Sequence, residues 1–473
     1  MDWSLQMREA PQWFKDAKFG MFFHWGPYSV PACENEWYSR NMYLKGSKQN
    51  LEHVRRFGKV SEFGYKDFFP QFRGEAFSAD DWADLVVRSG AKYAGPVSEH
   101  ADNFSMWHSK VNPINSMTYM GRDVVGECAE AFRKRGIRFL ATLHHQWLWG
   151  WFMSSDNEAD VYDPKNEIYY GPALPLETNR YMPYRMPDEK FCKTWLEKVR
   201  EVAVSYKPDV LYYDSRMLII PEEIRREAAD IYYNVAGVKD GIMTYKQADF
   251  PKGVGVYDVE CGRFAEKQPF VWQTDDRLED NITWCIVQNP KYKSAAKIIQ
   301  QLADVVSKNG NLLLNVGPRA DGTFPEEAKQ ELYKIGDWLS RCGEAIYGTV
   351  PFEIAYEGVT KGANEDYNIE RVKAQMKDGI AMESGAYRLT SQDFRFTRKG
   401  DSVYAIAMGK PENGVYAIHA FAKGKYLPDD VAVSILGCPG PARFERDDNE
   451  MRIYLPESLP DDLAYVVKVS PRK

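Results

Sequence analysis

Short runs of strand-forming residues alternate with amphipathic helical stretches along the first 350 or so residues of the chain. In two of the intervening stretches, 189–206 and 296–307, the apolar side chains fall on one helical stripe. Strands that alternate with helices are typical of a parallel sheet, and eight strands of this kind predict a closed (β/α)8 barrel of the TIM type. The eight candidate strands are 18–25, 92–100, 138–145, 209–214, 241–246, 255–260, 270–274 and 311–316.

The pattern changes after about residue 350, where the helical period disappears. DFRFTR and SVYAIAM flank the turn KGD and indicate a hairpin, and the alternating segments GVYAIHAFA, DVAVSIL, MRIYL and AYVVKV follow. These segments predict an antiparallel β-sandwich. Because 473 residues exceed the roughly 250–300 that one core usually serves, we expect two domains, a barrel at 1–350 and a sandwich at 351–473.

Charge and composition exclude several classes of partner. The net charge is −7 and no run of Lys and Arg would form a basic stripe, so nucleic acid is not an expected partner. No apolar run reaches the roughly 18–20 residues that cross a bilayer. The polar start MDWSLQMREAPQWF has no export signal, and Met1 fits either a natural start or the point where a signal was removed. We therefore expect a soluble protein, cytoplasmic or exported, and leave the compartment open.

The expected mouth of the barrel gathers the polar residues. In a TIM barrel the reactive side chains lie at the carboxyl ends of the strands, because the loops there form the open face. Five of the seven histidines lie at such ends or just beyond them, the fifth being His108. The motifs concerned are FFHWG with His24, VSEHADNF with His100, TLHHQW with His144 and His145, LYYDS with Asp214 and YDVECGR with Glu260.

Two carboxylates at these ends, Asp214 and Glu260, suit the cleavage of a glycosidic bond. Such a reaction needs one carboxylate at the anomeric carbon and one carboxylic acid beside the leaving oxygen. The alternative is that each merely pairs with a lysine or caps a helix. Other acids that could replace Glu260 are Glu36, Glu99, Asp275 and Asp276.

We expect neither a metal nor a cofactor. The seven cysteines show no CxxC spacing, and no HExxH, GxSxG, P-loop or Rossmann motif stands at a suitable strand end. The histidines could bind zinc, but they show no known ligand spacing. Hydrogen bonds to sugar hydroxyls explain them more simply.

The stretch WFKDAKFGMFFHWGPYSVPACENEWYSRNMY resembles the N-terminal signature of glycoside hydrolase family 29, the α-L-fucosidases. The resemblance continues through FSADDWADLVVRSGAKYAGPVSEHADNFSMWHSK, PDVLYYDS, WQTDD, VSKNGNLLLNVGPRADGTFPEEA, IGDWLSRCGEAIYGT and DFRFTRKGDSVYAIAMG. It implies a catalytic barrel followed by a β-sandwich. It also implies a retaining exo-glycosidase that releases terminal α-L-fucose from a fucosylated oligosaccharide or glycoconjugate.

The resemblance also implies roles for single residues. Asp214 matches the nucleophile of the family, and Glu260 in VECGR is the best match to its acid/base, because Gln273 stands where other members carry a glutamate after the tryptophan. Further positions match residues that bind the sugar. They are His24, Glu36, Trp37 and His100 for the hydroxyls, and Trp284 for the apolar methyl side.

Some positions differ from the family pattern. Ala101 stands in place of the second of two paired histidines, and Asn103 in place of a glycine. Lys246 replaces a frequent arginine, and His144 and His145 stand where a tyrosine is usual, so we count these three among the substrate-binding residues. The fine specificity is therefore open.

Three functions remain as alternatives. The first is an α-L-fucosidase that prefers α-1,3 or α-1,4 linkages, which the V-E and W-Q-T forms suggest. The second is a hydrolase of a related sugar such as an α-L-galactoside. The third is a non-catalytic carbohydrate-binding protein. The oligomeric state cannot be inferred from the sequence.

Overall fold

The computed structural model describes residues 2–176, 185–246, 249–360, 382–384, 389–460 and 463–472. Its larger part is a closed barrel of eight strands, in which each strand pairs in parallel with the next and the last pairs with the first. Each barrel strand overlaps one of the eight predicted runs, although the strand predicted at 270–274 lies at 272–277, and the predicted TIM-like barrel is confirmed. The strands are β1 (Phe19–Phe23), β2 (Tyr93–Glu99), β3 (Arg138–Leu143), β4 (Val210–Tyr213), β5 (Ile242–Lys246), β6 (Val256–Asp258), β8 (Trp272–Arg277) and β9 (Gly310–Asn315).

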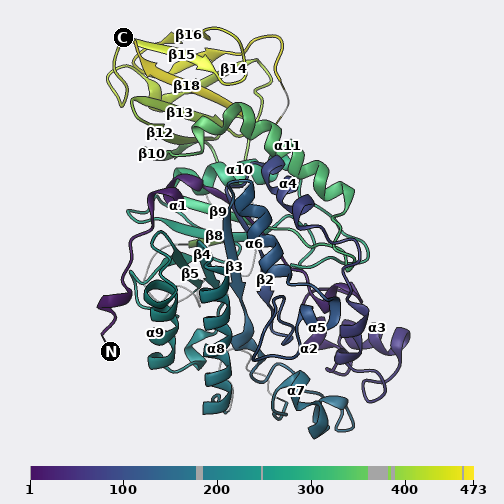
Figure 1. Ribbon diagram of the computed structural model, residues 1–473. Helices are drawn as coiled ribbons and strands as arrows, with labels where there is room; N and C mark the ends of the chain where they lie inside the picture. Colours follow the sequence, from purple (N-terminus) through teal and green to yellow (C-terminus); the bar gives the residue numbers. More distant parts are fainter. Residues whose placement is uncertain are drawn as a thin grey trace.

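Helices cover the outer face of the barrel (Figure 1). The two predicted helical stripes are α8 (Glu189–Tyr206) and α10 (Ala295–Ser307), and each begins at a capping residue, Asp188 or Ser294, whose side chain accepts a backbone N–H of the first turn. The other covering helices are α4 (Ala79–Ser89), α6 (Val124–Lys134), α9 (Glu222–Asp230) and α11 (Glu326–Cys342). Shorter helices are α1 (Gln12–Ala17), α2 (Tyr38–Asn41), α3 (Lys48–Phe57), α5 (Ser116–Met120) and α7 (Glu167–Tyr170).

Large apolar side chains fill the barrel, and α1 contributes Phe14 to this core. Phe22, Leu140, Tyr212 and Leu313 belong to the same buried cluster. The interior is therefore packed, and polar chemistry is left to the strand ends and the loops beyond them. None of the helices in the described ranges is long and apolar enough to span a membrane.

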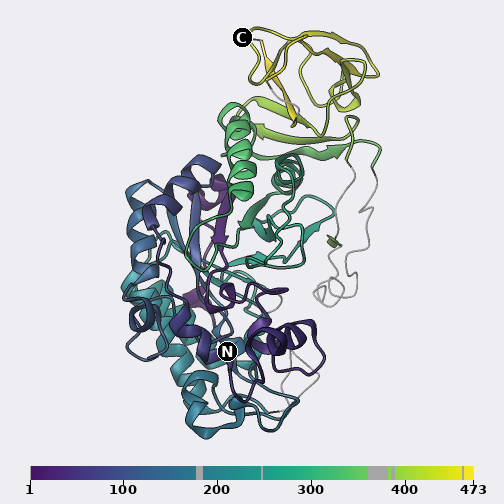
Figure 2. The ribbon, with the colours of Figure 1, turned by 90° about the vertical axis from the view of Figure 1, so that its right-hand side faces the viewer.

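The C-terminal part consists of antiparallel sheets above the barrel (Figures 1 and 2). One sheet has the order β10 (Val350–Glu357), β12 (Phe394–Lys399), β13 (Ser402–Ala407), β18 (Tyr465–Pro471) and β15 (Val431–Ile435). The second has the order β14 (Val415–Ile418), β17 (Met451–Tyr454) and β16 (Arg443–Arg446). Their apolar side chains share one core, which agrees with the predicted sandwich. The predicted hairpin at KGD is the β12–β13 pair.

Polar contacts attach the first of these sheets to the barrel helices. The indole of Trp338 on α11 donates a hydrogen bond of 2.8 Å to the carbonyl of Ala464. Arg395 on β12 forms a buried ion pair of 2.5 Å with Asp304 on α10. A short pair of β7 (Gly262–Phe264) with β11 (Met382–Ser384) joins the two parts again. The division into domains at residue 350 stays a prediction, and β10 begins at that residue.

Candidate active site

A buried lysine joins three carboxylates at the carboxyl ends of the strands. Lys246, the last residue of β5, places its Nζ atom 3.1 Å from Asp214 Oδ1, 3.1 Å from Glu260 Oε2 and 3.0 Å from Asp275 Oδ2. Asp214 follows β4, Glu260 follows β6, and Asp275 lies on β8. Sequence reasoning had expected Asp214 and Glu260 to meet across the mouth, and the structure brings them to one ammonium group.

Two side chains contact the carboxylate of Asp214, one at each oxygen. The indole N–H of Trp147 donates a hydrogen bond of 2.8 Å to Oδ2, while Oδ1 faces Lys246. Gln146 holds the backbone, because its side-chain amide donates to the carbonyls of Asp214 and Ser215 at 2.7 and 2.9 Å. Both carboxylate oxygens therefore have a defined direction. Sequence reasoning missed Trp147 and Gln146, although both follow the paired histidines in the TLHHQW motif.

Lys246 also limits the separation of the two carboxylates. One oxygen of Asp214 and one of Glu260 lie 3.1 Å from the same nitrogen, so these two oxygens are at most twice that distance apart. Inverting glycosidases hold their carboxyl groups about 6.5–9.5 Å apart, whereas retaining enzymes hold them about 5–5.5 Å apart. The geometry of this pair favours the shorter class.

A second carboxyl pair, Asp258 and Asp275, lies below the first. Burial raises the pKa of Asp258 well above its usual range, and the neighbouring Asp275 raises it further. Gln273 donates a hydrogen bond of 2.7 Å to Asp258 and accepts one of 2.8 Å from Tyr93. Burial also raises the pKa of Asp275, while the Lys246 ammonium group acts to lower it. Sequence reasoning did not identify Asp258, although it lies in the YDVECGR motif two residues before Glu260.

Three imidazoles stand beside the carboxylates, at the ends of β1, β2 and β3. The ring centroids of His24, His100 and His144 lie 5.1 to 5.6 Å from one another. Burial lowers the pKa of His100 to about 4 and places that of His24 well below its usual value, where the two other imidazoles lower it further. The rings are therefore neutral near pH 7, so each can both donate and accept a hydrogen bond.

Asn315 determines the tautomer of His24. The Nδ2 atom of Asn315 donates a hydrogen bond of 2.5 Å to the carbonyl of Trp284, so its Oδ1 atom faces His24 Nδ1 at 2.7 Å. Because Oδ1 can only accept, Nδ1 of His24 carries the proton. The Nε2 atom of His24 therefore keeps its lone pair and acts as an acceptor.

Glu36, Trp37 and Trp284 complete the predicted sugar-binding group. The backbone N–H of Trp284 donates a hydrogen bond of 2.9 Å to Glu36, and burial raises the pKa of Glu36 to about 7. The Trp284 ring lies 5.5 Å from His24, and the Trp37 ring lies 5.5 Å from Trp147. All three therefore lie close to the carboxylates or the imidazoles.

His145 lies apart from this group, although the sequence placed it beside His144. Its Nε2 atom lies 3.1 Å from the carbonyl of Trp195 on α8, and its ring stacks on the Trp195 indole at 5.2 Å. Adjacent residues that leave a strand point in different directions, so only one of the paired histidines reaches the group at the mouth.

Two of the alternative acids have other partners. Glu99 is buried and accepts from Lys198 and from Ser105, each at 2.5 Å. Asp276 pairs with Lys293 at 2.9 Å, and this cation holds the pKa of Asp276 at about 2 in spite of burial. Asp276 therefore has no proton to give near neutral pH, and the carboxylate of Glu99 is engaged by Lys198 and Ser105.

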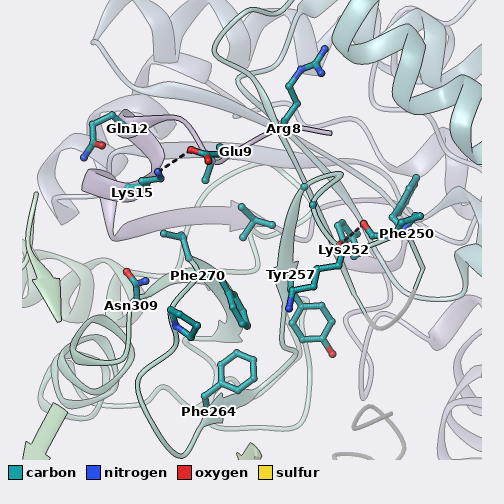
Figure 3. A pocket seen from close by; sticks show the side chains of 18 of the residues that line it. Arg8, Glu9, Gln12, Lys15, Phe250, Lys252, Tyr257, Phe264, Phe270 and Asn309 are labelled. Carbon is teal, nitrogen blue, oxygen red and sulfur yellow. Dashed lines mark hydrogen bonds and ion pairs between the residues drawn. The ribbon is translucent and has the colours of Figure 1, made fainter. Parts of the chain in front are cut away.

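A separate hollow of about 930 Å³ lies on the flank of the barrel (Figure 3). The N-terminal segment and the region around β6 and β8 line it, with aromatic side chains that include Tyr257, Phe264 and Phe270. Glu9 there pairs with Lys15 at 3.9 Å, and Asp16 accepts from Gln12 at 2.9 Å. No two described carboxylates of this hollow share a cation as Asp214 and Glu260 do, so the hollow is not the candidate active site.

A parallel barrel that carries two closely spaced carboxylates and neutral imidazoles at its strand ends defines a TIM-barrel glycoside hydrolase. The sequence profile described as Alpha-L-fucosidase matches residues 2–344, and the chain belongs to this family. The tissue α-L-fucosidase of Homo sapiens is 28% identical over 99% of this chain and 91% of its own length. The α-L-fucosidase of Dictyostelium discoideum is 28% identical over 74% of each chain.

Solved structures agree with this family assignment. The Thermotoga maritima α-fucosidase in complex with fucose is 26% identical, covers 97% of both chains and superposes with a TM-score of 0.73. Another structure of the Thermotoga maritima α-fucosidase covers 99% of both chains at 26% identity, with a TM-score of 0.74. These similarities extend through the barrel and the C-terminal sheets.

Proposed function

We propose that the enzyme releases terminal α-L-fucose from glycans by double displacement, with Asp214 as the nucleophile and Glu260 as the acid/base. The observation that carries this proposal is the single Lys246 nitrogen that contacts one oxygen of each carboxylate. This shared contact keeps the two oxygens closer together than the carboxyl groups of inverting enzymes, which supports a retaining pair, in which no water has to fit between carboxylate and sugar.

The first step forms a bond between an Asp214 oxygen and the anomeric carbon while the glycosidic bond breaks. Glu260 gives its proton to the departing oxygen. In the second step Glu260 takes a proton from water, the water oxygen attacks the anomeric carbon, and the Asp214 ester bond breaks. Trp147 and Lys246 stabilise the aspartate when it leaves, because each contacts one of its oxygens.

Neutral imidazoles bind the sugar hydroxyls. Because Asn315 fixes the tautomer of His24, its Nε2 atom accepts a hydrogen bond from a sugar hydroxyl. His100 and His144 lie beside His24. The protonated carboxyl of Glu36 can donate below about pH 7. Trp284 supplies an apolar surface for the methyl side of fucose. The Thermotoga maritima relative was solved with fucose bound, which supports the choice of sugar.

The test of the mechanism is the anomer that forms first. Hydrolysis of an aryl α-L-fucoside, followed by proton NMR, should give the α-anomer before mutarotation mixes the two forms. The β-anomer as first product would reject double displacement, and failure to hydrolyse any α-L-fucoside would reject the activity itself.

We propose a preference for α-1,3 or α-1,4 linkages, which rests on the sequence forms V-E at Val259 and Glu260 and W-Q-T at 272–274. Paired assays on α-1,2, α-1,3, α-1,4 and α-1,6 fucosylated oligosaccharides test it. Equal rates on all four, or a preference for α-1,2 or α-1,6, would contradict it.

One observation favours α-L-galactosides as a second substrate. Ala101, buried next to His100, stands where the family pattern has a second histidine, so the pocket beside the imidazoles differs from that pattern and has a smaller side chain at this position. Aryl α-L-fucoside and α-L-galactoside should be compared side by side. A kcat/KM for the galactoside within about tenfold of that for the fucoside would support this candidate, and no detectable galactoside hydrolysis would exclude it.

A further inference from the structure

We propose that His24, His100 and His144 form a binding site for a divalent transition-metal ion, zinc above all, and that this ion inhibits the enzyme by taking the place of the sugar. The inference goes beyond the proposed function, because hydrolysis by two carboxylates uses no metal. It also differs from our expectation from the sequence that no metal binds, because the histidines show no known ligand spacing. Ligands that come from three separate strands leave no spacing to find.

The geometry is that of a three-imidazole site. One ring nitrogen from each histidine lies within 4.8 Å of one from each of the others, and all three residues are buried. Tetrahedral zinc with bonds of about 2.0–2.1 Å holds its nitrogen ligands roughly 3.4 Å apart. Small side-chain rotations would therefore close the three nitrogens around an ion. Three histidines with a fourth, open position are a known zinc arrangement.

The nitrogens have lone pairs to offer. The hydrogen bond to Asn315 fixes the proton of His24 on Nδ1, which leaves Nε2 as a ligand atom. A second hydrogen bond, from Asn315 to Trp284, holds the amide in turn. Metal-binding imidazoles commonly have a partner of this kind on their other nitrogen. The Nδ1 atoms of His100 and His144 are buried and have no hydrogen-bond partner among the described residues.

The surrounding charge favours a cation. Asp214 and Asp275 contact Lys246 together with Glu260, the proposed proton donor, so two carboxylates besides Glu260 face one ammonium group. Asp214 is close enough to act electrostatically on both His24 and His100. Lys246 opposes a cation at His144, and the carboxylates outnumber it. A divalent ion would thus find negative charge next to its ligands.

The ligand type selects the ion. Imidazole suits zinc, copper and nickel, whereas magnesium and calcium prefer oxygen ligands. The same nitrogens are the ones that we assign to the sugar hydroxyls. An ion and a sugar therefore compete, and the expected result of zinc binding is loss of activity that a chelator restores.

Isothermal titration calorimetry with zinc chloride tests the site directly. His144→Gln removes one ligand, and His145→Gln is a matched control, because His145 is equally buried but points at Trp195. We expect one zinc per chain, an affinity at least ~100-fold lower in H144Q, and an affinity within about threefold of the original in H145Q. Magnesium chloride should give no heat of binding at the same concentrations.

Competition in the unmodified enzyme gives a second readout that needs no variant. Zinc should raise the melting temperature, and saturating L-fucose should weaken the apparent zinc affinity. Equal zinc binding by H144Q and H145Q, or binding unaffected by fucose, would overturn the proposal. Loss of activity on addition of a chelator would also overturn the proposal, since the ion would then be required for catalysis and not inhibitory. An enzyme inactive on fucosides that still binds zinc in this way would contradict the proposed function alone.

Discussion

Lys246 and Asp214 form an ion pair of 3.1 Å between Nζ and Oδ1, in which the lysine side chain is almost fully buried. Burial alone would lower the pKa of Lys246, but Asp275 and Glu260 outweigh it and hold this pKa well above its usual value. The ammonium group is therefore a permanent charge of the site. It contacts one oxygen of the proposed nucleophile and one of the proposed acid/base, and so holds the two carboxyl groups close together.

Replacing Lys246 with Met should destabilise the protein by about 3–5 kcal/mol, because it leaves buried carboxylates without their cation. The acid limb of the kcat/KM profile should move to higher pH, since the ionised carboxylates are no longer favoured. Urea unfolding and the pH profile measure the two effects.

Lys246→Arg is the matched control, because it keeps the charge. It should retain most of the stability and an acid limb near its original pH. If K246M matched the unmodified enzyme in both measurements, Lys246 would not be the charge that organises the site.

Asp214→Asn should lower kcat on aryl α-L-fucosides by at least ~10⁴-fold, because no leaving group compensates for a missing nucleophile. Binding of L-fucose, measured by calorimetry, should persist, since the imidazoles and Glu36 remain. Asp401→Asn, in the exposed turn between β12 and β13, is a neutral control. Retention of a tenth of the activity in D214N would remove Asp214 from the role of nucleophile.

Glu260→Ala should lower the rate of hydrolysis of natural fucosides by about 10²–10⁴-fold. With activated aryl fucosides, whose leaving group is a phenol, the rate of the first step should change little. A phenol departs without a proton, whereas a sugar alcohol does not. Added azide should restore part of the aryl fucoside rate and give a fucosyl azide of retained configuration, because a small anion needs no general base.

Two results would reassign the acid/base. Near-normal rates of E260A on natural fucosides would exclude Glu260, and so would the absence of azide rescue. The same assays on Glu36→Gln identify the most plausible replacement, because Glu36 is buried near Glu260 and its pKa is raised.

The sequence predicted the barrel strands well, because each is a short apolar run between turn signals and the runs alternate with helical stripes. It also predicted that Asp214, Glu260, His24 and His100 would meet, since strand ends of a barrel share one face. It could not show that His144, and not His145, points toward the other imidazoles. Which of two adjacent side chains points inward depends on the dihedral angles at the end of β3, and no pattern encodes them.

The partners of Asp214 and Lys246 were also beyond the sequence. Trp147 donates its hydrogen bond to Asp214 from the loop after a different strand, β3. The chain has 13 tryptophans, so the presence of a tryptophan in that loop does not by itself indicate a functional residue. Asp258 ends β6 and Asp275 lies on β8; the sequence offered Asp275 only as an alternative acid and did not single out Asp258. Their burial depends on the closed barrel, which brings β6 and β8 together.

The raised pKa of Glu36 predicts a stability that depends on pH. An unfolded glutamate loses its proton near pH 4.5, whereas burial holds the proton of Glu36 to about pH 7 in the folded enzyme. The protonated form therefore contributes stability that is fully present below about pH 4.5 and is lost as pH rises to about 7. With Glu36 fully buried, this loss amounts to roughly 3 kcal/mol.

The glutamine of the Glu36→Gln variant has no proton to lose. Between pH 4.5 and pH 8 the free energy of unfolding of the variant should therefore rise relative to that of the unmodified enzyme by up to ~3 kcal/mol. The difference in free energy of unfolding, measured in urea at several pH values, tests this. Glu34→Gln is the control, because Glu34 is exposed two residues away and forms only a long contact of 3.6 Å with Lys48. A difference between E36Q and the unmodified enzyme that stays constant with pH would mean that Glu36 is already ionised in the folded protein.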